Sequence, residues 1–216
     1  MQARRLGFLI LLCLLVLGSV TQARADVIVA RPLDTSRQGQ YSNLGPGTHQ
    51  QVADPFSLLQ SMTLESLLWY GRYDQTVTQT DVAFSIRLFA DESGTPGLAP
   101  IHQFDVTVTS SVLTGAWLSY FVALPNWTLG PGAYWLSIVE NDAGTPAMGN
   151  TQWLWGDTFG TGIRSVRDSD AGAWTTTMDV NHAFTLEGSA NVPEPTTMLL
   201  LGAGLAGLAL RHRRPR

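Results

Sequence analysis

Two aspartates at alternate positions, Asp168 and Asp170, have a spacing found in calcium-binding loops. Carboxylates at alternate positions of a turn supply the oxygen ligands that Ca²⁺ prefers. The sixth position of the loop is Ala173 instead of glycine, and the twelfth is Asp179 instead of glutamate, so an EF-hand is excluded. We expect no required cofactor. Asp168 and Asp170 are the candidate calcium ligands, and a solvated acidic turn is the alternative interpretation.

Trp153 and Trp155 are a second pair with a spacing that could support binding. Residues two apart on a β-strand project from the same face. If that face is solvated, the two indoles form a flat platform of the kind that stacks on sugar rings, and the partner would be a polysaccharide. Packing in the core is the alternative, because buried tryptophans contribute large apolar areas.

Patterns of catalytic residues are sparse. The chain contains no G-x-S-x-G nucleophile motif, and its histidines are isolated, without zinc-ligand spacing. The only cysteine, Cys13, lies in the N-terminal apolar run. Two glutamates in strand-like stretches, Glu65 and Glu187, could form the carboxylate pair of a glycan hydrolase, although solvent-facing strand residues are the simpler interpretation. We expect a protein that is not an enzyme, with a secreted glycan-acting hydrolase as the alternative.

The elements that would position these side chains are β-strands. Residues 81–90 alternate, with Val82, Phe84, Ile86 and Leu88 on one face, and Gly- and Pro-rich turns separate the successive runs. Further alternating or short β-like runs lie at 63–70, 104–109, 118–124, 134–138, 153–155, 163–167 and 183–187. The pattern predicts an all-β domain of nine to eleven short strands, a β-sandwich or jelly-roll-like fold.

The N-terminal 25 residues have the three parts of a secretory signal peptide. Arg4 and Arg5 precede an apolar run at residues 6–20, and Ala23 and Ala25 form a small-x-small cleavage site. Signal peptidase is therefore an expected partner, and the mature chain is expected to begin at Asp26. An uncleaved anchor is the alternative. Without Cys13 the mature chain has no disulfides, so its core alone must stabilise it.

The C-terminal residues 191–216 form a different kind of signal. Uncharged, mostly apolar residues at 196–210 would span roughly 22 Å as a helix, which is short against a hydrocarbon core of about 30 Å. A buried helix is the alternative to this membrane helix. Arginine side chains can snorkel, and a basic C-terminal end stays in the cytoplasm, so the domain lies outside. The residues that define the signal are Val192, Pro193, Glu194, Pro195, Arg211, Arg213 and Arg214.

The region between the two signals is acidic. Between Asp26 and Val192 there are six arginines and sixteen acidic residues, a net charge of −10, and the chain contains no lysine. Phosphate binding needs a basic face, so nucleic acid is excluded as a partner. The domain between the signals, at residues 26–190, is therefore acidic, a charge that permits solubility or cation binding.

Pro-Glu-Pro, a short apolar run and an arginine-rich end resemble the PEP-CTERM sorting signal. The resemblance implies recognition by an exosortase, cleavage near the Pro-Glu-Pro, and a Gram-negative bacterium that makes exopolysaccharide. Residues 43–188 also resemble exported β-sandwich domains that accompany such anchors, which have no agreed activity. We therefore expect an exported, non-enzymatic cell-surface or extracellular-matrix protein. It would be transiently anchored in the membrane by its tail and could bind exopolysaccharide.

Overall fold

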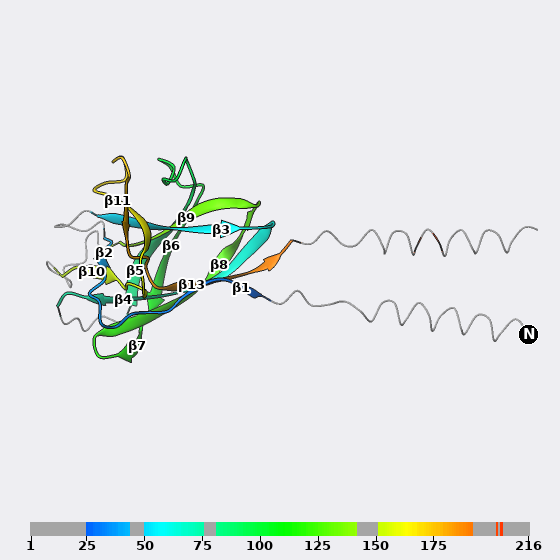
Figure 1. The fold of residues 1–216 in the computed structure, drawn as a ribbon. Helices are drawn as coiled ribbons and strands as arrows, with labels where there is room; N and C mark the ends of the chain where they lie inside the picture. The colour runs from blue at the N-terminus through cyan, green and yellow to red at the C-terminus, as the bar shows by residue number, and fades with distance from the viewer. Residues whose placement is uncertain are drawn as a thin grey trace, which may run out of the picture.

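The computed structural model describes residues 25–43, 50–75, 81–141 and 151–191, together with Gly202 and Gly204. These residues contain thirteen β-strands in two sheets (Figure 1). The strands are β1 (Asp26–Arg31), β2 (Gln40–Tyr41), β3 (Gln51–Leu58), β4 (Met62–Tyr73), β5 (Asp81–Ala90), β6 (His102–Thr109), β7 (Ser111–Thr114), β8 (Trp117–Leu129), β9 (Gly132–Glu140), β10 (Trp153–Trp155), β11 (Gly162–Arg167), β12 (Thr175–Asp179) and β13 (Phe184–Ala190).

The first sheet is built around β4, its central strand. On one side β4 pairs first with β13 and then with β10, and on the other side it pairs with β8. β1 extends the sheet beyond β13, β2 extends it beyond β10, and β7 pairs with β8. Neighbouring strands in this sheet run antiparallel, so each strand end lies beside the start of another.

The second sheet has the order β12-β11-β3-β9-β5-β6, again antiparallel throughout. β5 and β9 are buried on both faces over most of their length. One face packs on the first sheet. On the other face, Phe89 contacts Trp174, and the Arg167 guanidinium lies over both rings at 5.3 and 4.4 Å. The segment between β11 and β12 therefore covers part of this sheet's outer face.

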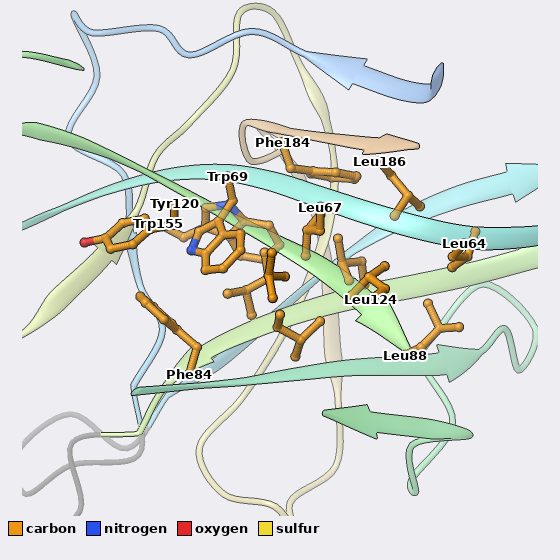
Figure 2. Packing of buried hydrophobic residues seen from close by; sticks show 14 of the residues in the cluster. Leu64, Leu67, Trp69, Phe84, Leu88, Tyr120, Leu124, Trp155, Phe184 and Leu186 are labelled. Atoms are coloured by element: carbon orange, nitrogen blue, oxygen red, sulfur yellow. The ribbon is translucent and has the colours of Figure 1, made fainter. Parts of the chain in front are cut away.

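The core between the sheets is apolar and rich in aromatic rings (Figure 2). Trp69 stacks on Tyr120 with ring centroids 5.4 Å apart, and both rings contact Phe84 edge-on. Burial raises the pKa of Tyr120, since its phenolate would be desolvated there. Fully buried aromatic side chains supply much of the apolar area that stabilises a domain without disulfides.

The prediction of an all-β, two-sheet architecture is confirmed. The alternating run at residues 81–90 is β5, and Val82, Phe84, Ile86 and Leu88 are all buried in the core as expected. The structure contains more strands than predicted, because the interior strand β3 and the short edge strands β1, β2, β7 and β12 were missed. The predicted signal helix and the C-terminal helix at 196–210 lie outside the described residues, apart from Gly202 and Gly204.

Candidate functional site

β13 is the last strand before the predicted sorting signal, and it is an interior strand of the first sheet. It pairs with β4 on one side and with β1 on the other. Phe184 and Leu186 point into the core and are completely buried, whereas Thr185 and Glu187 are only half-buried. The chain therefore reaches the start of its C-terminal signal from a strand on which the fold depends.

β13 passes unusually close to β4 at Gly188. The register of the pair shifts just before this glycine, because Glu65 is an extra residue in β4. A Cβ atom on Gly188 would lie 2.2 Å from the carbonyl oxygen of Thr63, so a side chain does not fit there. The Ser189 hydroxyl donates a 2.5 Å hydrogen bond to the Glu65 carboxylate. The last residues of the strand are thus fixed closely against β4.

Asn191, which follows β13, is held by two hydrogen bonds. Its backbone N–H donates to the carbonyl oxygen of Ser61 at 2.9 Å, and its Oδ1 accepts from the Thr63 hydroxyl at 2.9 Å. Ser61 belongs to the turn between β3 and β4. The chain is therefore fixed to the folded domain up to the residue directly before Val192, where the predicted Val-Pro-Glu-Pro begins.

The start of the described domain lies beside its end. Asp26, the first residue of β1, pairs with Gly188, and Ala25 before it is exposed. Ala190 pairs with Met62, Met62 pairs with Leu129, and the β3–β4 and β8–β9 turns follow next to them. We call this end of the sandwich, on the right in Figure 1, the tail-proximal end. It consists of residues 25–27, 59–61, 130–132 and 190–191.

Most residues of the two predicted signals lie outside the described part of the chain. They are Ala23, Val192, Pro193, Glu194, Pro195, Arg211, Arg213 and Arg214. Ala25 is described, directly before β1. Among the described residues, no helix is both long and apolar enough to cross a membrane.

Comparison with known families identifies the C-terminal signal. Residues 191–214 match the PEP-CTERM protein-sorting motif. The chain carries this motif. It indicates an exported protein whose membrane-anchored sorting depends on an exosortase, and this confirms the resemblance drawn from the Pro-Glu-Pro and the basic end. No curated protein matches the chain.

The two tryptophans predicted as a sugar-binding platform are part of the core. Trp153 and Trp155 are completely buried, since their side chains are part of the apolar core cluster. The Trp153 ring contacts Phe84 edge-on at 5.0 Å. Trp155 stacks on His182 at 4.8 Å, and its indole N–H donates to the carbonyl oxygen of Ala183 at 3.1 Å. The prediction of a solvated platform is therefore wrong, and the core alternative describes both residues.

The candidate calcium ligands lie on the turn after β11, where Asp168 is exposed. Asp170 forms ion pairs with Arg87 and, at 3.5 Å, with Arg167. A carboxylate directed at two guanidinium groups is already neutralised, which disfavours Asp170 as a calcium ligand. In residues 25–43, 50–75, 81–141 and 151–191, no three Asp, Glu, His or Cys side chains are grouped to hold a metal ion.

Sequence reasoning missed a buried polar cluster around His182. The Asp54 carboxylate accepts the backbone N–H of His182, and it lies 3.2 Å from Nδ1 of the same ring. Arg31 Nη1 lies 3.4 Å from this carboxylate, and Asp157 Oδ1 lies 3.8 Å from His182 Nε2. Burial raises the pKa of Asp157, and the nearby His182 only partly opposes this effect.

This buried polar cluster links the two sheets. Asp54 is in β3 of the second sheet, Arg31 is in β1 of the first, and His182 lies two residues before the start of β13. Asp54 and His182 have no exposed surface, so these groups cannot contact a dissolved substrate in this conformation. The partners lie up to 128 residues apart in the chain, and no local pattern signals their pairing.

Proposed function

We propose that this protein is a non-enzymatic component of the cell surface or extracellular matrix, delivered there by exosortase-dependent sorting. The observation that carries the proposal is the position of the PEP-CTERM motif. It begins at residue 191, directly after β13, so the motif is joined to a complete sandwich with almost no linker. The tail would serve delivery, and the sandwich would be the delivered cargo.

The buried ionisable side chains of the sandwich domain are paired with one another, which supports a structural role for this domain. Asp54 and His182 are enclosed in the buried polar cluster. Arg87 and Arg167 share the Asp170 carboxylate. Ionisable groups that are enclosed and paired in this way are not free for acid–base chemistry on a dissolved substrate. Trp153 and Trp155 are buried in the core, so they cannot form a surface that binds exopolysaccharide. The proposal therefore rests on the sorting motif.

The test is to compare the full chain with two variants in its own cell. Deleting residues 192–216 leaves every described strand in place, so we expect a folded, exported domain that no longer fractionates with the membrane. Replacing Pro193, Glu194 and Pro195 by alanine keeps the apolar run. This variant should stay in the membrane fraction as an unprocessed precursor. Unchanged location and mass for both variants would contradict exosortase-dependent sorting.

A further inference from the structure

The tail-proximal end must lie close to the membrane while the tail is anchored there. Only four residues, 192–195, separate Asn191 from the apolar run that begins at Thr196. Five fully extended steps of the chain span at most about 18 Å. The polar headgroup layer alone occupies roughly 5–8 Å on each side of the hydrocarbon core. Since Asn191 is hydrogen-bonded to Ser61 and Thr63, this limit applies to the folded domain itself.

The composition of this end differs from that of the rest of the domain. Residues 25–27, 59–61, 130–132 and 190–191 contain one charged side chain, Asp26, in a domain of net charge −10. Leu59, at the tip of the β3–β4 turn, is 97% exposed, and Val27 is 58% exposed. A strongly acidic surface would be repelled by anionic lipid headgroups, whereas an end with a single charged side chain and an apolar tip meets much less repulsion.

We propose that the tail-proximal end rests on the lipid headgroup surface of the membrane that anchors the tail, with Leu59 inserted among the lipids. This inference rests on the anchored tail of the proposed function and adds the orientation of the domain. The strands of the first sheet then rise from the membrane, and the opposite end of the sandwich faces outward. Contact with lipid would keep the peptide bond that is cleaved near the Pro-Glu-Pro close to the membrane surface, where the exosortase can reach it.

The structure offers a matched control position at the other end. Val112 in β7 is also an exposed apolar residue, at 77%. It pairs with Leu118, and Leu118 pairs with Gly71 of β4. Gly71 lies nine residues beyond Met62, which corresponds to roughly 30 Å along the strand. In Figure 1, β7 accordingly lies away from the ends of β1 and β13.

The experiment uses single fluorescent labels on the full chain. Cys13 is the only cysteine, so Leu59→Cys and Val112→Cys in a Cys13→Ser background each give one labelling site. Each labelled chain is reconstituted into phosphatidylcholine–phosphatidylglycerol vesicles, and flotation with the vesicles is measured. Lipids carrying a nitroxide on the headgroup are then added to the composition. We expect the Leu59 label to lose most of its fluorescence and the Val112 label to keep it.

Each other outcome overturns a defined statement. If both chains float with the vesicles but neither label is quenched, the chain is bound to the membrane and the proposed orientation is wrong. If the Leu59 label is shielded from a soluble quencher but is not quenched by the lipids, a second copy of the chain covers Leu59, and the proposed contact with lipid is wrong. Equal quenching of both labels would mean that the domain lies flat on the membrane. If neither chain floats, the anchored tail itself is contradicted, and the inference falls with it.

Discussion

Gly188 combines two constraints at a single residue. It lies where the register of β13 shifts against β4, and it pairs with Asp26, so both neighbouring strands approach it. The missing Cβ leaves room for the Thr63 carbonyl oxygen. A methyl group here would have to displace backbone instead of a flexible side chain, which is the costly form of overpacking.

We expect Gly188→Ala to lower the free energy of unfolding by about 1–3 kcal/mol, the range typical of overpacked sites. Denaturant unfolding of the purified chain measures this change. Gly130→Ala is the matched control, since a Cβ there meets no atom within 4 Å. Equal stability of the Gly188→Ala variant and the wild type would show that β13 can shift away from β4 at little cost.

Asp157, in the buried polar cluster, makes the stability of the domain depend on pH. Burial raises its pKa above the ordinary 3.8, so the folded chain binds this proton more tightly than the unfolded chain. The contribution of such a group to the free energy of unfolding falls as pH rises through the window above its ordinary value. Asn cannot ionise and lacks this dependence.

Asp157→Asn should therefore gain stability relative to the wild type between about pH 4 and pH 7. Unfolding free energies of both chains across this range give the difference directly. Asp168→Asn, on the exposed turn, is the control for removing one carboxylate outside the buried polar cluster. A difference that is constant with pH for Asp157→Asn would mean that this carboxyl does not carry a raised pKa.

At the scale of elements, some strands could be predicted with their exact bounds, whereas others were found only in part or missed. β5 and β10 have the predicted bounds, because uninterrupted alternation or a bounded apolar run marks them. β4 is harder to recognise, since the extra residue Glu65 shifts the inward face from Leu64 to Leu67. β3 was not predicted as a strand, because Pro55 interrupts it and the buried Asp54 looks like a surface residue.

β13 provides a direct test at this scale. A chain that ends at Asn191 keeps every described strand, so it should unfold cooperatively and remain as stable as the full chain. A chain that ends at Ala183 loses the completely buried Phe184 and Leu186 and leaves β1 without a partner. Burying one such side chain stabilises a protein by roughly 1.5–3 kcal/mol, against a total of about 5–15. Circular dichroism and thermal unfolding should show no native state for the shorter chain.

A native-like transition for the chain that ends at Ala183 would contradict the role of β13 as an interior strand. The expected result also bears on export. Because β13 comes last and pairs with both β1 and β4, the first sheet cannot be completed before the end of the domain has been translocated. The sorting motif, which starts at residue 191, is then the next segment to follow.

For the whole molecule, the sequence was sufficient to predict export and sorting of the protein. It did not predict which end of the sandwich lies next to the C-terminal tail. Targeting signals are local in the chain, so the Pro-Glu-Pro and the basic end could be recognised directly. The tail-proximal end brings together four segments that are far apart in sequence, and only the strand pairing makes them neighbours. The buried polar cluster escaped notice for the same reason, since Asp54 and His182 are 128 residues apart.

The hydrogen bonds that fix Asn191, where the chain leaves the folded domain, also have a mechanical consequence. A pull applied through the tail reaches the folded domain at Asn191, directly after β13, and its component along that strand loads β13 lengthwise. β13 is bonded on both sides, so the ladders to β1 and β4 are loaded in shear together instead of opening one bond at a time. Resistance to forced unfolding is set by the rate of unfolding. The tail of this protein thus follows a strand that is hydrogen-bonded to a neighbour on each side.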